Sequence, residues 1–310
     1  MQQLSHGKYN YLTLNNSTQI PPIGFGTYKL IDIHPRIETA IKAGYRLIDT
    51  AKLYENETQI GETLQKIFSD KSMNIKREDL YIVTKLWQDD HEDPVKALKI
   101  ALDKLKLSYV DLYLVHWPLG VMENGVPKKK VPLHILWSNM EKCVETGLCK
   151  SIGVSNFNAQ LLLDLVSYAK IQPVINQVEL NPYFTQNDLV DVCNSLNIKI
   201  MAYMPACKGS SAMRHKDIVE KYDLYKNEVI CNLAKKYNKT PPQIVLNWHL
   251  HRGIIPLPRS NSDEHIIENF GCSDFIMEDK EYENISGLNM NMRLSIGKDK
   301  AFSLGFEIFA

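Results

Sequence analysis

The sequence predicts an α/β protein in which strands and helices alternate to form a closed parallel barrel, the (β/α)8 or TIM barrel. Short apolar runs that suit buried strands alternate with segments that repeat apolar residues every three or four positions, as amphipathic helices do. Six of the apolar runs end in polar residues. Polar groups at the carboxyl ends of parallel strands gather on one face of a barrel, and in barrel enzymes that face carries the active site.

Eight strands are expected. The six runs with polar ends reach them at Asp49, Lys85, His116, Ser155–Asn156, Asn176–Gln177 and Tyr203. A glycine-rich run over 20–28 precedes these six, and a run over 253–258 follows them. Glycines in a strand permit close approach of backbone or of a ligand. Asp49 would end a buried strand, and a buried carboxylate needs a cation to offset its desolvation, so a positive partner is expected for it.

Helical patterns separate the strands, over 35–43, 57–68, 94–107, 133–145, 159–169, 186–196, 228–237 and 240–251. The weak alternation over 8–20, with a turn at 15–17, predicts a β-hairpin that caps the closed bottom of the barrel. Two long loops, 119–132 and 205–225, are expected to cover the site as lids. The lysines at 128–130 are interpreted as part of a solvated loop.

The composition argues against several kinds of partner. The formal net charge is zero and the pI is about 7.1, which shows no bias toward nucleic acid or acidic membranes. The N-terminus lacks an apolar core, and no segment is long and apolar enough to span a bilayer. We expect a soluble cytoplasmic monomer with no nucleic-acid or membrane partner. Since no repeat or low-complexity tract divides the chain, one domain over 1–310 is expected.

The cysteines and histidines do not predict a metal site. The six cysteines are scattered, without a CxxC pair or a Cys/His cluster of metal-ligand spacing, which fits reduced thiols in the cytosol. His249 and His251 form the only close histidine pair, and residues two apart on a helix do not share a face.

Several motifs together are specific enough to indicate a family. They lie at 44–51 with 54–57, and at 84–87, 111–118, 152–157, 176–179 and 267–270. In these motifs, which span nearly the whole chain, the sequence resembles the aldo-keto reductases, and in pattern most of all the aldose reductase and aldehyde reductase group. The resemblance implies NADPH-dependent reduction of aldehydes and ketones to alcohols, with NADH as a possible substitute.

The family's four catalytic residues match Asp49, Tyr54, Lys85 and His116. Tyr54 would donate the proton, and we expect the Lys85 ammonium to lower its pKa from about 10. Asp49 would hold Lys85 charged, and His116 would orient the carbonyl. Taken singly, these residues suit a structural ion pair, a loop aromatic, a solvent-facing charge and a core histidine. Together at four motif positions they favour catalysis.

The cofactor site is inferred from the resemblance, because no Gly-x-Gly-x-x-Gly turn supports a Rossmann site. Ser155, Asn156 and Gln177 would hold the nicotinamide amide and Tyr203 would stack on its ring. Arg259 and Ser260 would take the 2′-phosphate, and Glu268 and Asn269 the adenine. The remaining candidate cofactor contacts are Gly26, Thr27, Tyr28, Asp49 and His265.

Two departures from the family pattern affect this cofactor site. The usual Tyr-Ser-Pro-Leu-Gly reads Tyr203-Met204-Pro205-Ala206-Cys207, and His265 stands where many members have a second arginine. Both are expected to weaken cofactor affinity or relax the preference for NADPH, with Lys208 compensating in part. The altered loop after Tyr203 also keeps a second hypothesis open, a non-catalytic member that uses the fold for binding or structure.

The substrate pocket would be walled by Tyr28, where relatives often have tryptophan, by Trp87 and Trp117, and by His116. Aromatic walls favour a small uncharged carbonyl compound with an apolar or sugar-like body. Packing at the barrel rim is an equal alternative for Trp87. The C-terminal loop over 286–310, which covers the pocket in relatives, diverges too far to interpret.

Overall fold

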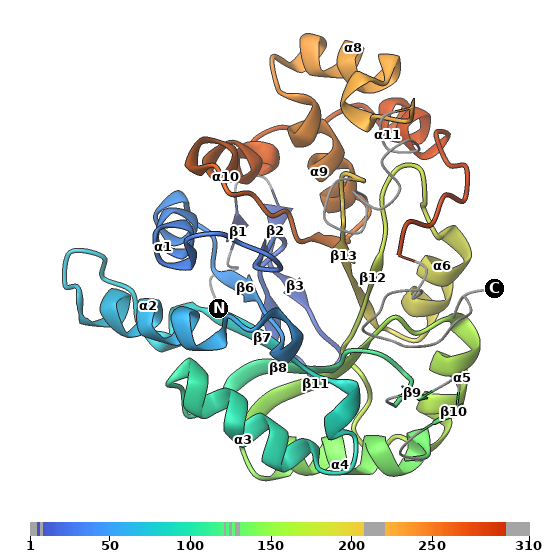
Figure 1. Cartoon of the computed structure of the whole chain (residues 1–310). Coiled ribbons are helices and arrows are strands. Elements are labelled where there is room, and N and C mark those ends of the chain that lie inside the picture. The colour runs from blue at the N-terminus through green and yellow to red at the C-terminus, as the bar shows by residue number, and fades with distance from the viewer. Residues whose placement is uncertain are drawn as a thin grey trace.

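A sheet of eight parallel strands forms the centre of the part of the chain that the structure describes (Figure 1). In spatial order the strands are β5 (Phe25–Gly26), β6 (Leu47–Asp49), β7 (Tyr81–Leu86), β8 (Val110–Val115), β11 (Cys149–Ser155), β12 (Ile175–Glu179), β13 (Lys199–Tyr203) and β14 (Ile255–Pro256). Sequential strands are neighbours throughout, so each connection is a simple crossover. The register places Asp49 beside Val83, and Lys85 beside Leu114.

The computed structural model describes residues 5–6, 9–120, 122–123, 126–127, 131–207 and 221–295. Two backbone hydrogen bonds join the first strand to the last. The Gly24 N–H donates to the Pro256 carbonyl and the Gly26 N–H to the Pro258 carbonyl, each at 3.0 Å. These bonds close the sheet on itself, and they confirm the predicted (β/α)8 barrel. We call this join the barrel seam.

The helices form an outer ring around the strands in Figure 1. Those in the described part of the chain are α1 (Ile33–Ala43), α2 (Glu57–Ser69), α3 (Pro94–Leu105), α4 (Leu133–Glu145), α5 (Ala159–Tyr168), α6 (Asn187–Ser195), α8 (Glu228–Tyr237), α9 (Pro241–His251), α10 (Asp263–Phe270) and α11 (Asp279–Ser286). The eight predicted helical patterns correspond to α1–α6, α8 and α9. Helix α9 begins as expected, because Thr240 and Gln243 form a capping box at its N-terminus. Helices α10 and α11 were not predicted.

A β-hairpin closes the bottom of the barrel, as predicted. Strands β3 (Leu12–Thr13) and β4 (Gln19–Ile20) pair antiparallel around a turn in which the Ser17 N–H donates to the Leu14 carbonyl at 3.0 Å. Leu14 and Ile20 are buried in the apolar interior of the barrel. The Asn16 side-chain amide donates to Ser151 Oγ at 2.8 Å, at the start of β11. The hairpin therefore seals the end opposite the polar strand ends.

Two further antiparallel pairs lie outside the barrel. One joins β1 (Ser5–His6) to β2 (Tyr9–Asn10), and the other joins β9 (Met122–Glu123) to β10 (Val126–Pro127). The second pair lies in one of the two loops predicted as lids. The lysine run at 128–130, Lys208 and most of the second loop lie outside the described residues.

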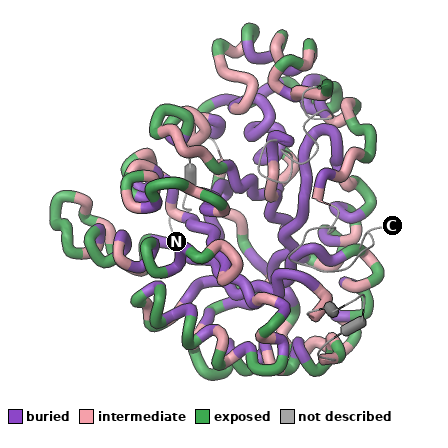
Figure 2. The backbone as a smooth tube through the Cα atoms, in the orientation of Figure 1, coloured by how far each residue is buried: buried purple, intermediate pink, exposed green. Residues whose placement is uncertain are grey.

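The apolar core has two layers. In Figure 2 the buried stretches of the chain lie toward the centre and the exposed stretches toward the outside. The inner layer fills the barrel, and the outer layer separates strands from helices. Leu47 belongs to the inner layer while its neighbour Ile48 packs in the outer one, as the alternation of side chains along a strand requires. The inner layer consists of Leu14, Ile20, Leu47, Tyr81, Val83, Leu112, Leu114, Val174, Ile175, Met201, Ile255 and Leu257.

Candidate active site

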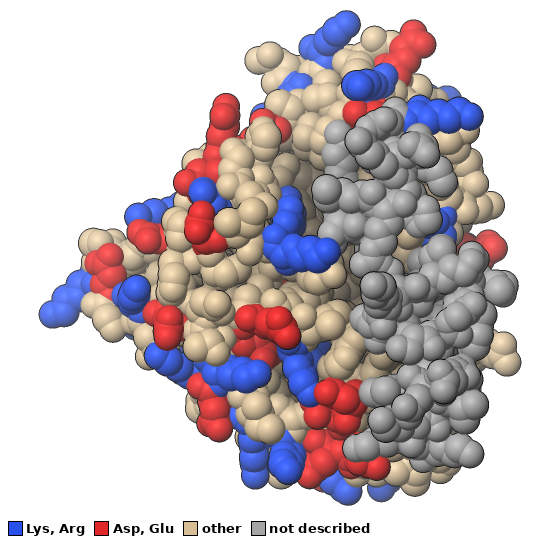
Figure 3. Space-filling model, in the orientation of Figure 1, with Lys and Arg blue, Asp and Glu red and all other residues tan. Residues whose placement is uncertain are grey.

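The polar strand ends meet at one mouth of the barrel, which Figure 3 shows as a hollow edged by charges of both signs. Leu47 and Val83 face the barrel interior. Asp49 and Lys85 lie two residues further along β6 and β7, so both side chains point into the mouth, where they are buried. His116 directly follows β8, and its N–H extends the hydrogen-bond ladder to β7. The fold thus brings these three predicted residues together.

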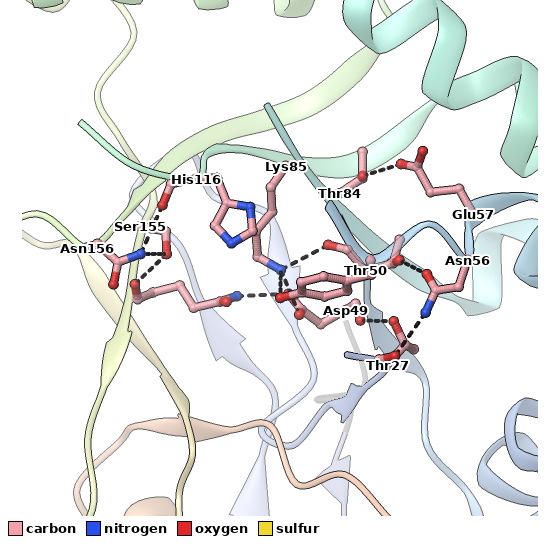
Figure 4. Close-up of polar contacts among 12 residues, drawn as sticks. Thr27, Asp49, Thr50, Asn56, Glu57, Thr84, Lys85, His116, Ser155 and Asn156 are labelled. Carbon is pink, nitrogen blue, oxygen red and sulfur yellow. Dashed lines mark hydrogen bonds and ion pairs between the residues drawn. The ribbon is translucent and has the colours of Figure 1, made fainter. Parts of the chain in front are cut away.

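The Lys85 ammonium lies at the centre of the site, and Figure 4 shows it between His116 and the segment of Asp49 and Thr50. Its Nζ donates to Asp49 Oδ1 at 2.7 Å, to the Thr50 carbonyl at 2.9 Å and to the Tyr54 hydroxyl at 3.2 Å. An ammonium has three donors, and all three have acceptors here. Asp49 is therefore the carboxylate partner of a buried cation, as the sequence predicted.

A small polar network fixes the turn that carries Tyr54. This residue ends the short 3-10 helix η1 (Lys52–Tyr54), which follows β6. The Thr27 hydroxyl donates to the Asp49 carbonyl at 2.8 Å, and the Asn56 amide donates to the Thr27 carbonyl at 2.9 Å. The Thr50 hydroxyl donates to Asn56 Oδ1 at 2.7 Å (Figure 4). Both sides of the turn are thereby tied to Thr27, the residue that directly follows β5.

Burial shifts the pKa values of the site, and one expectation was wrong. Burial, with the charge of Asp49, raises the pKa of Tyr54 well above its usual value, whereas we expected Lys85 to lower it. Burial also lowers the pKa of Lys85, although Asp49 opposes that shift. Burial and the neighbouring Lys85 hold the pKa of His116 well below its usual value, so its imidazole is neutral near pH 7.

Aromatic rings pack against Tyr54 and His116. The Tyr28 ring lies 4.8 Å from the Tyr54 ring, and the His116 ring lies 5.9 Å from it, measured between centroids. Trp87 lies edge-on to His116 at 5.1 Å, and Trp117 is buried beside this histidine in the chain. His116 Nδ1 is buried without a hydrogen-bond partner among the described residues. Three of the predicted substrate-pocket residues, Tyr28, Trp87 and His116, thus form one aromatic cluster with Tyr54.

The four residues predicted for the nicotinamide form one connected cluster. The Asn156 amide donates to the His116 carbonyl at 2.9 Å and to Ser155 Oγ at 3.1 Å, while the Tyr203 hydroxyl donates to Asn156 Oδ1 at 2.8 Å. Ser155 Oγ donates to the Gln177 carbonyl at 2.8 Å. Sequence reasoning did not predict the bond from the Gln177 amide to Asp49 Oδ2, at 2.8 Å.

The residues predicted for the phosphate and adenine lie on the segment after β14. Ser260 Oγ accepts the Ser262 N–H at 3.0 Å, next to the start of α10. His265 is exposed on the first turn of α10. Glu268 accepts the Thr240 hydroxyl at 2.7 Å, and Asn269 is half-buried. Within the described ranges, these four residues make no hydrogen bond or ion pair with Asp49, Tyr54 or Lys85.

Arg259 and Gly26 lie at the barrel seam. The Arg259 guanidinium donates to the carbonyls of Tyr28 and Lys29, the first at 3.0 Å. A Cβ at Gly26 would come within 3.2 Å of the Leu257 carbonyl oxygen, so glycine permits the close approach of the first and last strands here. The sequence pattern indicated this approach but not which backbone makes it.

Glu179 is a buried residue that sequence reasoning missed. It lies two positions after Gln177 on β12, and its carboxylate accepts the Leu294 N–H at 2.9 Å and the Ser295 N–H at 2.6 Å. A polar residue at the end of a buried strand was the available signal. Its partners come from a distant segment that the sequence did not place.

Other features of the described residues lie away from this mouth. A cavity of about 560 Å³ opens at the opposite end of the barrel, between the hairpin and Arg46, Asp111 and Lys150. No group of three or more His, Cys, Asp or Glu side chains in the described ranges is arranged to hold a metal ion. None of the described helices combines the length and apolar character needed to cross a bilayer.

Comparison with known proteins identifies the family. A model of the Aldo/keto reductase family matches residues 22–290, which is most of the chain. The chain belongs to the aldo-keto reductase family. Aldose reductase C of Dictyostelium discoideum is 41% identical over 304 residues, covering 92% of this chain and 91% of the relative. A 9,11-endoperoxide prostaglandin H2 reductase of Trypanosoma cruzi is 36% identical, covering 96% and 98% of the two chains.

A solved structure agrees. The Bombyx mori aldo-keto reductase in complex with NADP superposes with a TM-score of 0.84 at 35% identity, covering 93% of this chain and 95% of the other. As an aldo-keto reductase, this chain is an oxidoreductase that reduces carbonyl groups with NADPH. No comparison favours the non-catalytic alternative.

Proposed function

We propose that this aldo-keto reductase reduces small uncharged aldehydes and ketones to alcohols, with Tyr54 as the proton donor. The observation that carries the proposal is the position of Lys85. Its ammonium lies between the Asp49 carboxylate, at 2.7 Å, and the Tyr54 hydroxyl, at 3.2 Å. A buried cation bonded to a phenol favours the phenolate that remains after the proton leaves.

The raised pKa of Tyr54 is compatible with this role. The phenol is fully protonated at neutral pH, so the donor is always loaded. Hydride addition turns the carbonyl oxygen into an alkoxide, which is about as basic as hydroxide and far more basic than a phenolate. Because the Lys85 ammonium favours the phenolate that remains, the proton can pass from Tyr54 to the substrate oxygen. Neutral His116 would donate a hydrogen bond to the same oxygen and orient it.

The residues of the mouth fit a nicotinamide cofactor. The Gln177 side chain is buried and is fixed by the bond from its amide nitrogen to Asp49, which leaves its oxygen as the acceptor end of the same amide. An amide oxygen held in this way can accept an N–H of a carboxamide. We propose that Ser155, Asn156 and Gln177 hold the carboxamide and that Tyr203 stacks on the ring. The nicotinamide supplies the hydride when it is bound.

We propose that Arg259, Ser260, Glu268 and Asn269 bind the adenosine end of NADPH, with NADH as a weaker alternative. Arginine presents a planar fork that suits a phosphate. His265, as an exposed side chain on the first turn of α10, would contribute less than an arginine. Gly26 ends β5 and Thr27 and Tyr28 directly follow it, and we place the cofactor against these three residues.

The aromatic walls support an uncharged substrate. Tyr28 and Trp87 flank Tyr54 and His116 respectively, so the carbonyl compound would lie between rings. Rings bind apolar bodies and the faces of sugars alike. We place Trp117, buried next to His116, in the same wall.

We further propose that residues 1–310 form one domain and that the protein is a cytoplasmic monomer. The barrel seam leaves no free edge in the eight-stranded sheet for pairing with a second chain. All six cysteines are unpaired, which suits a reducing compartment. Sedimentation of the purified chain and cell fractionation would test these points.

The test of the proposed function is the loss of NADPH absorbance with a reactive aromatic aldehyde. We expect turnover by the native chain, a fall in kcat of at least about 10²–10⁴-fold in Tyr54→Phe, and undiminished NADPH binding by that variant. Tyr109→Phe, at a half-buried tyrosine that packs under Arg77 away from the mouth, serves as the control. Unchanged turnover in Tyr54→Phe would contradict the mechanism.

A further inference from the structure

We propose that Arg259 is a positioning residue for the substrate wall, because its guanidinium holds the loop that carries Tyr28 against the catalytic Tyr54. This role is additional to its proposed contact with the 2′-phosphate. The inference rests on the proposed reductase function, and it concerns how the segment after β14, which carries Arg259, is connected to the segment after β5, which carries Tyr28.

The first observation is that Arg259 prolongs the barrel seam beyond the last backbone bond. The ladder between the first and last strands ends with the Gly26 N–H on the Pro258 carbonyl, at 3.0 Å. Arg259 Nε then donates to the Tyr28 carbonyl at 3.0 Å, and its Nη2 donates to the Lys29 carbonyl. A side chain thus replaces the next pair of rungs.

The second observation is that the held loop needs support. Lys29 adopts a left-handed backbone conformation with φ of 53°, which costs about 1 kcal/mol for a residue other than glycine. Tyr28 is half-buried, and its contact with Tyr54 is a ring packing at 4.8 Å rather than a hydrogen bond. The Arg259 bonds therefore decide where the Tyr28 ring stands relative to the reacting hydroxyl.

The third observation is that one arginine has enough donors for both tasks. A guanidinium carries five N–H groups in a plane, and the two carbonyls use two of them. Three remain for an anion. A lysine at this position would keep the charge but could not span two carbonyls and a phosphate, since its donors radiate from one atom. Arg259→Lys therefore separates the two roles.

The experiment measures the KM for an aromatic aldehyde with saturating NADH, which has no 2′-phosphate. If Arg259 positions Tyr28, Arg259→Met and Arg259→Lys both raise this KM by about five- to tenfold with little change in kcat. With NADPH, Arg259→Lys recovers most of the cofactor affinity that Arg259→Met loses, but it does not recover the KM for the aldehyde. An unchanged aldehyde KM with NADH in both variants would overturn the inference.

Two controls show that the effect runs through Tyr28. In the first control, Arg36→Met removes a guanidinium that pairs with Asp263 and so links α1 to α10, but that does not bond to Tyr28. This variant is expected to leave the aldehyde KM unchanged. In a Tyr28→Ala background, Arg259→Met is expected to add nothing further. An undiminished effect of Arg259→Met in that background would also overturn the inference.

A readout independent of turnover separates this inference from the proposed function. Arg259→Met is expected to speed amide hydrogen exchange at Leu30 and Ile31, whose N–H groups donate to the Thr27 carbonyl and to Asn261 Oδ1. The Arg36→Met control is expected to leave these rates unchanged. Unchanged rates in Arg259→Met would refute the positioning role, whereas absence of any turnover by the native chain would refute the reductase function alone.

Discussion

The Gln177 side-chain amide donates a 2.8 Å hydrogen bond to Asp49 Oδ2 across the barrel, between residues 128 positions apart in the chain. The other oxygen of the same carboxylate accepts from Lys85. A single carboxylate therefore connects the group proposed to hold the nicotinamide to the group proposed to support proton transfer.

Replacing Gln177 with Leu should lower both stability and catalysis. The buried Asp49 oxygen would lose its donor, and a hydrogen bond to a charged group contributes about 1.5–3 kcal/mol. We expect the free energy of unfolding in urea to fall by about that amount and kcat/KM to fall with it. Gln172→Leu, which removes an exposed amide bonded to the Ala169 carbonyl, is the matched control. Equal losses of unfolding free energy and of kcat/KM in the two variants would show that the bond to Asp49 contributes no more than an exposed hydrogen bond does.

Replacing Asp49 with Asn should move the pH dependence of catalysis toward acid. Burial already lowers the pKa of Lys85, and Asp49 is the main group that opposes this shift. Without the Asp49 carboxylate the pKa of Lys85 falls further, so the ammonium loses its proton at a lower pH. The basic limb of the profile of kcat/KM against pH should therefore move to lower pH. Asp90→Asn, which removes a partner of Lys52 at the rim, should leave the profile in place. A profile of Asp49→Asn that keeps the native basic limb would contradict the assignment.

His249 should make the protein less stable in acid. Burial lowers its pKa from 6.5 to about 4, although the Val245 and Leu180 carbonyls oppose the shift. The unfolded chain therefore binds one more proton than the folded chain between these two pH values. The free energy of unfolding is thus highest above pH 6.5 with respect to His249, and it falls as the pH drops toward 4. His249→Gln should flatten the dependence of unfolding free energy on pH by about 1.4 kcal/mol per pH unit in this window. Urea titrations at several pH values measure the free energy of unfolding of both proteins. Plots of this free energy against pH that run parallel for the native chain and His249→Gln would contradict the prediction.

Shortening the buried Leu14 side chain of the hairpin should lower the free energy of unfolding without lowering kcat/KM. Leu14 is buried at the closed end of the barrel, where Leu14→Ala should cost about 2–5 kcal/mol of unfolding free energy. Lys85 lies at the other mouth, so kcat/KM at low temperature should stay within about twofold of native. Leu12→Ala, at a half-buried neighbour, should cost less. A loss of activity larger than the loss of folded protein would mean that the two ends of the barrel are coupled.

Local patterns were sufficient to predict the barrel. Each strand is a short apolar run with a polar end, and each matching helix has an apolar stripe, so alternation alone set the topology. Helices α10 and α11 were missed because their apolar residues are few and their exposed faces are rich in charge. The sequence resemblance placed Asp49, Tyr54, Lys85 and His116, and the fold brought them together.

What the sequence could not predict depends on burial and on long-range partners. The direction of the pKa shift of Tyr54 follows from its desolvation, which outweighs the nearby ammonium and is a property of the folded chain. Gln177 and Arg259 each have several donors, and their acceptors come from segments more than a hundred positions away. No local pattern specifies which acceptor such a side chain will find.

The barrel seam also bears on how the chain is made. Tyr28 and Arg259 are 231 positions apart, so the first strand emerges from the ribosome long before its last neighbour exists. At about 5–20 residues per second, this interval lasts roughly ten to fifty seconds. Throughout it the N–H groups of Gly24 and Gly26 form an unpaired edge that can join another chain. Nascent chains of this protein therefore need that edge shielded until synthesis is nearly complete.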